Sequence, residues 1–243
     1  MKKYRSLILC EGETDQALIG SYLEATVGWA YLKKTNDFPF QGERICTYQK
    51  DESNALGIWQ VGGNDFSRAL DMILEGAKKD EVVDNIAVVT DHDDLDAEQN
   101  RSQAILNIFS SSLGVEPLTK EHYLNKWYPI SYNNVFGSSV IQFCYLLVPL
   151  EETGALETFM MNSLSEQNAE NRNVILQART FVREFSSEIY LRERREKVKA
   201  ELGVSLSVFS PDRVFTTMKE LIDSVSWGDF TTAHEQFKRL QEL

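Results

Sequence analysis

Short apolar runs alternate with amphipathic segments along the first 150 residues. Four of these runs have the length and composition of buried strands: SLILC at 6–10, IWQVGGND at 58–65, NIAVVT at 85–90 and VIQFCYLLVPL at 140–150. Helical spacing of apolar residues follows the first three runs, in residues 15–29, 66–80 and 101–114. A further short strand is expected in ERICTYQK, at 43–50. The pattern therefore predicts strands and helices in regular alternation.

The remaining third of the chain has a helical pattern. Helical segments are expected at 154–164, 173–203, 211–225 and 229–243. Alternating strands and helices predict an α/β fold with a mainly parallel sheet flanked by helices, followed here by a helical C-terminal third. No internal repeat or Pro/Gly linker divides the sequence. We therefore expect 1–243 to form a single compact unit, with an α/β core in 1–152 and a helical extension in 153–243 packed on it.

Composition places the chain among ordinary globular proteins, since 42% of the 243 residues are hydrophobic and 26% are charged. The longest apolar runs are much shorter than the roughly 20 residues that cross a bilayer, and the first residues lack the features of a signal peptide. We expect a cytoplasmic protein that makes no contact with a membrane. A net charge of −12 argues against a broad nucleic-acid-binding surface but leaves room for a local site.

Cysteine and histidine give no indication of zinc. Cys10, Cys46 and Cys144 have no CxxC spacing, and they are expected to be reduced thiols of the core. His92 is expected to be structural, because the middle residue of an extended triplet points away from its neighbours. His122 and His234 lack the spacing of metal ligands.

Acidic residues follow two of the predicted strands without a spacer. EGETD, residues 11–15, comes directly after SLILC, and DHDD, residues 91–94, comes directly after NIAVVT. Because ligand sites of open α/β sheets lie outside the carboxyl ends of the strands, Glu11 and Asp91 are expected to share a site. Asp93 would lie on the same side as Asp91, and Asp15 could return to the same space from the first helical turn. Carboxylates without neighbouring His or Cys suit Mg²⁺ or Mn²⁺.

Each acidic segment also has a simpler interpretation. In EGETD, Gly12 could form a tight turn while Glu13 and Asp15 favour the positive end of the helix. DHDD could be a solvated loop. The joint placement of both segments after buried strands leads us to favour a shared site.

These two motifs resemble the Toprim domain found in topoisomerases, bacterial primases, OLD-type nucleases and RecR-like repair proteins. That family has a glutamate after its first strand and an Asp-x-Asp pair after a later one, which match Glu11, Asp91 and Asp93 over residues 5–150. The resemblance implies a compact α/β fold whose acids bind Mg²⁺ and support cleavage or transfer at phosphodiester bonds. It implies that Glu11 acts as general acid/base and also helps to hold the ion, and that Asp15, Asp91 and Asp93 are metal ligands.

The segment VPLEETGALETFM, at 148–160, resembles small standalone Toprim-like proteins and OLD-type nucleases in which a later helix brings another glutamate. This resemblance adds Glu157 to the expected metal ligands. The alternative for Glu157 is a solvent-facing acid in the first turn of a helix.

The chain also departs from several members of that family. It has no tyrosine context typical of a topoisomerase nucleophile, no zinc-binding cysteine set as in primases and no Walker A motif. Topoisomerase and primase activities are therefore poor fits. The basic segment LRERREKVKAELG, at 191–203, could be the solvated face of a helix. By resemblance to the nuclease branch, its Lys199 is the residue we expect to assist catalysis by contacting phosphate.

The sequence thus predicts a Mg²⁺-dependent phosphodiester hydrolase or nuclease acting on DNA or RNA through a local metal site. A separately encoded protein is a candidate partner. The alternative is a non-catalytic Toprim-like binding module that keeps its acids for a structural ion or a protein partner. A third hypothesis, an enzyme acting on a small nucleotide, accounts for the acidic charge but has no motif of its own.

Overall fold

The structure is a computed structural model. It describes residues 4–32, 44–62, 65–79, 83–92, 95–116, 118–119, 124–150, 152–185, 189–213 and 216–243. Asp93 and His122 lie outside these described residues.

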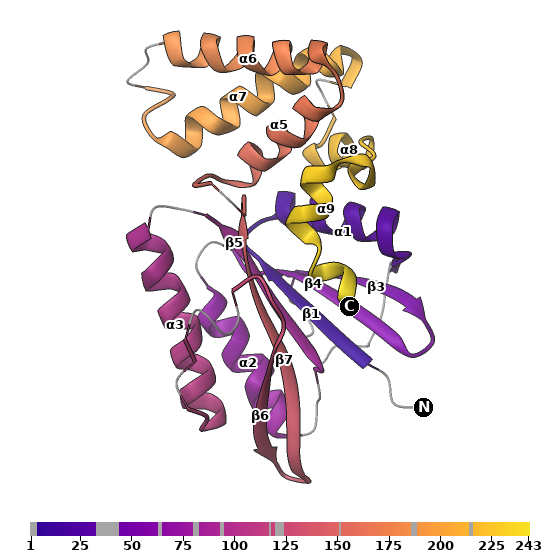
Figure 1. The fold of residues 1–243 in the computed structure, drawn as a ribbon, viewed down its shortest axis with the longest axis vertical. Coiled ribbons are helices and arrows are strands. Elements are labelled where there is room, and N and C mark those ends of the chain that lie inside the picture. Colours follow the sequence, from indigo (N-terminus) through magenta and orange to yellow (C-terminus); the bar gives the residue numbers. More distant parts are fainter. Residues whose placement is uncertain are drawn as a thin grey trace.

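One sheet forms the centre of the molecule (Figure 1). In the described residues its strands are β1 (Tyr4–Cys10), β2 (Ala30–Leu32), β3 (Ile45–Asp51), β4 (Asn54–Gln60), β5 (Asn85–Asp91), β6 (Tyr128–Asn134) and β7 (Gly137–Val148). They lie in the order β2-β3-β4-β1-β5-β7-β6. The central strands β4, β1, β5 and β7 are parallel to one another, as the alternating pattern predicts.

The edges of the sheet are antiparallel, which the sequence pattern did not reveal. Strand β3 pairs with β4, β2 with β3, and β6 with β7, all antiparallel. Only Glu52 and Ser53 separate β3 from β4, and only Val135 and Phe136 separate β6 from β7. Connections this short form hairpins, whereas parallel neighbours need a long crossover.

Helices cover both faces of the sheet and form the C-terminal part (Figure 1). The described α-helices are α1 (Glu13–Val27), α2 (Phe66–Lys78), α3 (Leu95–Leu113), α5 (Leu156–Glu166), α6 (Ala169–Glu184), α7 (Arg194–Phe209), α8 (Met218–Asp223) and α9 (Thr231–Phe237). Short 3₁₀ turns are η1 (Pro211–Arg213), η2 (Trp227–Asp229) and η3 (Leu240–Glu242). The predicted α/β fold with a helical C-terminal part is confirmed.

The predicted helical segment 173–203 is divided in two. Helix α6 ends at Glu184 and α7 begins at Arg194, and the two helices pack against each other. The division lets α6 bury Ile175 and Val182 while α7 buries Leu202 and Leu206. A single straight helix could not fold these two apolar stripes onto each other.

Successive side chains of the central strands pack alternately into two separate hydrophobic cores. Leu7 and Leu9 of β1 pack in the cluster beneath α2 and α3, whereas Ile8 and Cys10 pack on the opposite face with α1 and the C-terminal helices. This alternation is the normal side-chain geometry of a strand covered on both faces.

The C-terminal segment contacts the sheet layer through hydrogen bonds as well as apolar packing. Gln236 Nε2 donates to the carbonyl of Leu147 at 2.7 Å, and Trp127 Nε1 donates to the carbonyl of Arg239 at 2.8 Å. Trp227 is buried in the core that α1 and the C-terminal helices form on one face of the sheet. None of the described helices is long and apolar enough to span a membrane.

Two helix-interior glycines allow a direct test of this packing. Gly20 of α1 faces Tyr48 of β3 so closely that a Cβ atom would overlap the tyrosine Oη, whereas Gly203 of α7 has open space around it. We expect Gly20→Ala to lower the free energy of unfolding by about 1–3 kcal/mol, because the site has no room. Gly203→Ala should raise it by about 0.5–1 kcal/mol through better helix propensity. Urea denaturation measures both, and equal stabilisation by the two variants would contradict the α1–β3 packing.

Candidate functional site

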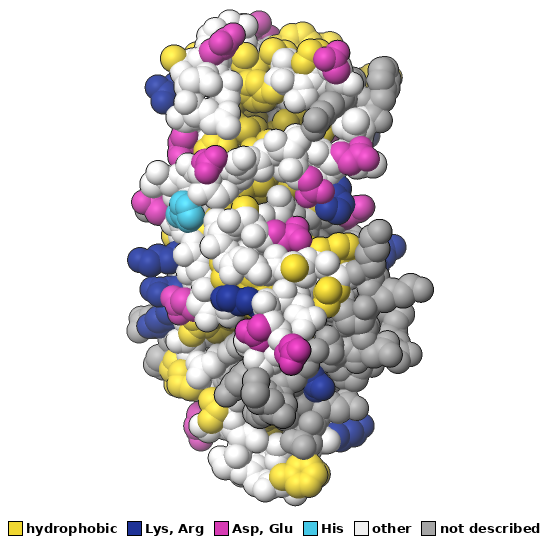
Figure 2. Space-filling view, turned by 90° about the vertical axis from the view of Figure 1, so that its right-hand side faces the viewer, with side chains coloured by type: hydrophobic (Ala, Val, Ile, Leu, Met, Phe, Trp, Pro, Cys, Tyr) yellow, Lys and Arg dark blue, Asp and Glu magenta, His cyan; other side chains and the backbone are white. Residues whose placement is uncertain are grey.

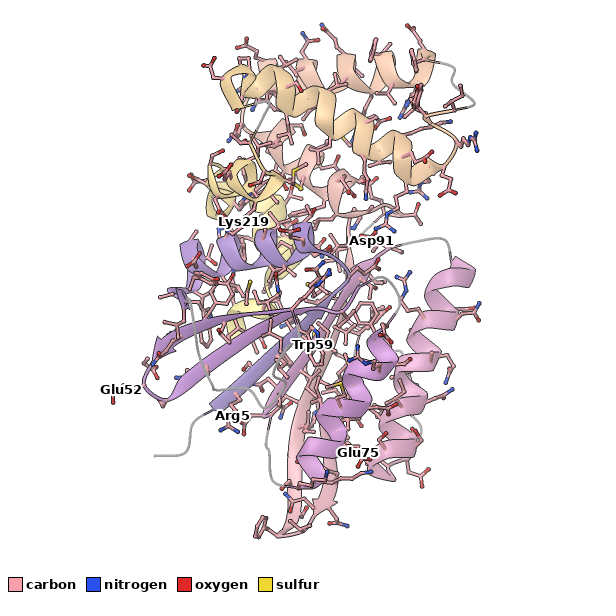
Figure 3. The ribbon with its side chains drawn as sticks, turned by 180° about the vertical axis from the view of Figure 1, so that it is seen from behind. Arg5, Glu52, Trp59, Glu75, Asp91 and Lys219 are labelled. Carbon is pink, nitrogen blue, oxygen red and sulfur yellow. The ribbon has the colours of Figure 1, made fainter. Side chains whose placement is uncertain are left out.

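The two acidic segments meet at the carboxyl edge of the sheet. Strands β1 and β5 are parallel neighbours, with Cys10 in register with Val89. Glu11 directly follows β1, and Asp91 is the last residue of β5. Figure 3 shows Asp91 at the end of the sheet that faces the C-terminal helices. The sheet therefore brings together two residues that are far apart in the sequence.

Glu11 and Asp91 are in direct contact and are almost completely buried. The backbone N–H of Asp91 donates to Glu11 Oε1 at 3.3 Å, and the two residues are 6% and 8% exposed. Burial removes both carboxyl groups from the water that would otherwise stabilise their charges. The pairing of β1 and β5 thus holds both carboxyl groups at a position where ionising them is unfavourable in free energy.

Asp15 adds a third buried carboxyl group from the first turn of α1. Its Oδ2 accepts a hydrogen bond from the backbone N–H of Gly12 at 3.0 Å, and Gly12 is the N-cap of the helix. The capping interpretation of EGETD is therefore correct for Asp15. The same residue is 9% exposed and interacts electrostatically with Glu11, so capping and membership of the acidic cluster coexist.

Glu157 reaches the cluster from α5. The backbone N–H of the preceding residue, Leu156, donates to Asp91 Oδ1 at 3.1 Å, which holds the start of α5 against the end of β5. The Glu157 side chain is 13% exposed, and its charge acts on both Asp15 and Asp91. The alternative of a solvent-facing acid at this position is wrong, because α5 begins directly above the sheet edge.

Burial and mutual repulsion raise the pKa values of two of these acids. The pKa of Asp15 rises to about 7, first through desolvation and then through the charge of Glu11. The pKa of Asp91 rises to about 8, again first through desolvation and then through the charges of Glu11 and Asp15. Buried acids that repel one another destabilise the fold. Clusters of acids with raised pKa values are therefore typical of functional sites, where such a cost is tolerated.

Arg101 is a member of the site that the sequence analysis missed. Its Nη1 lies 3.2 Å from Glu11 Oε1 and donates to the carbonyl of Asp91 at 3.3 Å. The arginine side chain is 13% exposed, so this ion pair is largely buried. Arg101 comes from α3, ten residues after Asp91. The sequence signal that points to it is a single arginine on the helix that directly follows the second acidic segment.

The basic residues of α7 are mostly solvent-exposed, as the simpler interpretation of that segment expects. Two of them nevertheless reach the rim of the cluster. Lys199 Nζ lies 4.0 Å from Glu157 Oε1, and Arg194 Nη2 donates to the carbonyl of Thr153 at 2.9 Å. The Lys199 side chain is 52% exposed, so it borders the buried acids without entering them.

His92 has the structural role that its position predicts. Its backbone N–H donates to the carbonyl of Val148, its ring Nδ1 lies 3.0 Å from the carbonyl oxygen of Pro149, and its own carbonyl accepts from Gly154. These contacts tie the end of β5 to the segment that leads into α5.

The thiols are free, and two of them are buried. Cys10 and Cys144 lie in the core while Cys46 is partly exposed, so the expectation of core thiols holds for two of three. Burial, followed by the charge of Asp15, raises the pKa of the Cys10 thiol. A protonated thiol is a poor metal ligand.

The donor chemistry of the cluster fits a hard divalent cation. Glu11, Asp15, Asp91 and Glu157 offer carboxylate oxygens, which Mg²⁺ and Mn²⁺ prefer. Within the described residues, no three or more His, Cys, Asp and Glu side chains already stand in the arrangement of a metal-ligand set. The predicted ligand Asp93 is outside those residues.

Comparison with known proteins assigns a family. Residues 5–240 match the family described as "Protein of unknown function (DUF3226)", and the chain belongs to this family. The comparison with curated proteins gives no match. Among solved structures, the chain is similar to the hypothetical protein PH0156 from Pyrococcus horikoshii OT3, with 15% sequence identity and a TM-score of 0.46. That similarity covers 90% of this chain and 95% of the other.

The raised pKa of Asp91 predicts how stability depends on pH. Aspartate in an unfolded chain has a pKa of about 3.9, so the folded chain binds more protons between about pH 4 and 8 and loses stability as the pH rises. Without divalent ions, we expect Asp91→Asn to raise the melting temperature at pH 8 by roughly 2–4 °C, the shift that about 1 kcal/mol gives in a chain of this size. The gain should be smaller at pH 5, where the native carboxyl group is protonated.

Asp71→Asn is the matched control for this experiment, because Asp71 is an exposed aspartate on α2. Scanning calorimetry at both pH values gives the comparison. A gain for Asp91→Asn that is equal at pH 5 and pH 8 would show that Asp91 is not strained by its charge.

The Arg101–Glu11 ion pair predicts strong energetic coupling. Arg101→Met should lower the free energy of unfolding by about 3 kcal/mol, because it leaves a buried carboxylate uncompensated. In a Glu11→Gln background the same substitution should cost less, with a coupling energy of about 1–3 kcal/mol. The exposed Arg68–Asp65 pair, at 3.6 Å, is the control and should show a coupling below about 1 kcal/mol. Strict additivity at Arg101 and Glu11 would refute the pair.

Proposed function

We propose that this DUF3226 protein is a Toprim-type, Mg²⁺- or Mn²⁺-dependent phosphodiester hydrolase that acts on nucleic acid. One observation carries the proposal. Glu11, Asp15 and Asp91 are buried together at the carboxyl end of the neighbouring parallel strands β1 and β5. The resemblance of the two acidic motifs to the Toprim pattern supports the assignment of chemistry.

The carboxyl groups divide naturally into two roles. Glu11 would move protons at the reacting centre, since it lies between Asp91 and Arg101 and a carboxylate can act as general acid or base. Asp15, Asp91 and Glu157, with Asp93, would hold the cation, and Glu11 would help to hold it. A bound divalent cation supplies charge that polarises a phosphoryl oxygen and lowers the pKa of water.

Arg101 and Lys199 extend the site with positive charge. Arg101 holds the Glu11 carboxylate through their 3.2 Å ion pair and so orients the proposed proton-transfer group. Lys199 stands at the exposed rim beside Glu157, where a phosphate oxygen of the substrate could reach it.

Contact with nucleic acid is proposed to be local. Figure 2 shows acidic and basic side chains interspersed over one broad face of the molecule, so that face has no field of a single positive sign. The net charge of −12 points the same way. The free cysteines support the proposal that the protein acts in a reducing compartment, the cytoplasm.

A second candidate function is a non-catalytic binding module. The observation that favours it is again the Arg101–Glu11 ion pair, because an internal arginine partly neutralises the cluster without any metal ion. In that case the acids would hold the end of the sheet and α5 together, and a divalent cation would add little.

A cleavage assay distinguishes the two functions. Supercoiled plasmid and single-stranded RNA are incubated with Mg²⁺ or Mn²⁺ and the wild-type protein, Glu11→Gln or Asp91→Asn. We expect the wild type to cleave at least one substrate and Glu11→Gln to lose about 10²–10⁴-fold in rate, the usual contribution of a general acid or base. Glu75→Gln, an exposed acid on α2, should retain full activity.

Melting temperatures provide the second half of the test. Wild-type protein should be stabilised by millimolar Mg²⁺ or Mn²⁺ through mass action, and Asp91→Asn should lose most of that shift. Equal background cleavage by every variant, together with a wild-type melting temperature indifferent to both ions, would reject the hydrolase and leave the binding module.

A further inference from the structure

Helices α6 and α7, with the described residues between them (185 and 189–193), form an arm that exposes an unusual amount of apolar surface. More than half of the large hydrophobic residues found exposed in the described chain lie there: Leu176, Phe181, Phe185, Ile189, Tyr190 and Val208. Phe181 and Phe185 are 58% and 49% exposed, and their rings stack on each other with centroids 6.2 Å apart and an interplanar angle of 29°. Large exposed apolar patches mark interaction sites.

The arm also reverses the charge of the molecule. Residues 169–209 contain eight Lys and Arg against six Glu, whereas the whole chain has a net charge of −12. Arg195 and Lys197 are exposed on the first turns of α7. Arg183 Nε lies 3.9 Å from Glu201 Oε1, so the end of α6 that carries the aromatic rings packs against α7. Exposed rings and exposed cations therefore belong to the same helix pair.

The basic end of the arm adjoins the acidic cluster. Arg194 contacts the carbonyl of Thr153 and Lys199 approaches Glu157, so the first turns of α7 lie at the rim of the site. In Figure 1 the arm and α5 lie beyond the same end of the sheet, at the end of the molecule opposite the β6–β7 hairpin. An extended ligand bound along the arm would reach the carboxylates of the acidic cluster.

Stacked exposed aromatic rings beside cations suit a single-stranded nucleic acid. Bases stack on aromatic side chains, cations follow the phosphates, and every base has a face that can stack. A duplex offers neither unstacked bases nor the flexibility to follow such a surface. We propose that the α6–α7 arm binds single-stranded nucleic acid, with Phe181 and Phe185 stacking bases and Arg195 and Lys197 contacting phosphates.

This inference deepens the proposed function by naming the substrate form, and it rests on that function only for the link to cleavage. Binding itself is testable without catalysis. Fluorescence anisotropy with labelled 20-nucleotide oligo(dT), oligo(U) and a duplex of equal length is measured in EDTA, using Glu11→Gln protein. We expect both single strands to bind at least tenfold more tightly than the duplex.

Two double variants separate stacking from charge. Phe181→Ala/Phe185→Ala should weaken single-strand binding about tenfold or more, in line with the cost of losing a base–aromatic stack. Arg195→Ala/Lys197→Ala should weaken binding and reduce the slope of log Kd against log salt by about 1.4, because each phosphate contact on a single strand contributes about 0.7. Circular dichroism melts confirm that these surface variants remain folded.

Matched controls lie elsewhere on the chain. Phe136→Ala removes an aromatic ring that is 77% exposed at the tip of the β6–β7 hairpin, and Arg68→Ala removes an exposed cation on α2. Both should bind like the parent protein. Unchanged binding by the two double variants, an equal loss in Phe136→Ala, or a preference for duplex would each overturn the proposal.

Binding to lipid vesicles is a separate test, because aromatic and basic residues can also recognise a membrane surface. Sedimentation with phosphatidylcholine/phosphatidylserine vesicles should show no binding that depends on Phe181 and Phe185. Vesicle binding lost in that variant, without oligonucleotide binding, would replace the proposal with a membrane surface. Single-strand binding without cleavage by the wild type in Mg²⁺ or Mn²⁺ would refute only the proposed hydrolase function. Cleavage that the arm variants leave unchanged would refute only the proposed role of the arm.

Discussion

The repulsion among carboxylates at the end of the sheet is the constraint on which the site depends. Strands β1 and β5 are adjacent and parallel, with Cys10 in register with Val89, so the residue that follows β1 lies near the residue that ends β5. In this chain both side chains are acids, and α1 and α5 bring two more. The protein holds them together with an internal arginine and with backbone N–H donors at Asp91, Gly12 and Leu156.

Those internal partners decide how much of the repulsion is relieved. Arg101 compensates Glu11, and backbone hydrogen bonds act on Asp15 and Asp91 against their burial. The compensation is incomplete, since the pKa values of both aspartates remain raised, to about 7 and about 8. A site that remains short of positive charge is suited to a divalent cation, and this shortage is what the hydrolase proposal uses.

The centre of the fold could be predicted from the sequence because it rests on local patterns. SLILC and NIAVVT are continuous apolar runs typical of strands buried on both faces, and the helices after them have clear apolar stripes. The edges were harder. Strand β6 alternates exposed and buried residues in the segment YPISYNN, whose polar side chains conceal the alternation, and β2 has only three residues.

Within the site, a residue could be predicted when the sequence next to it fixes its position. Glu11, Asp15 and Asp91 could be placed because each lies directly beside a predicted strand end or helix start. Arg101 could not, since its approach to Glu11 depends on how α3 packs against the sheet. The approach of Lys199 to Glu157 depends in the same way on the packing of α7 beside α5, which no sequence periodicity records.

The central claim is that the buried carboxylates capture a divalent cation, and anomalous diffraction from crystals grown with Mn²⁺ measures this most directly. We predict one strong anomalous peak within direct coordination distance of the carboxyl oxygens of Asp91 and at least one of Glu11 and Asp15. Crystals saturated with Mn²⁺ that show these acids without a peak, with Arg101 still paired to Glu11, would contradict the account.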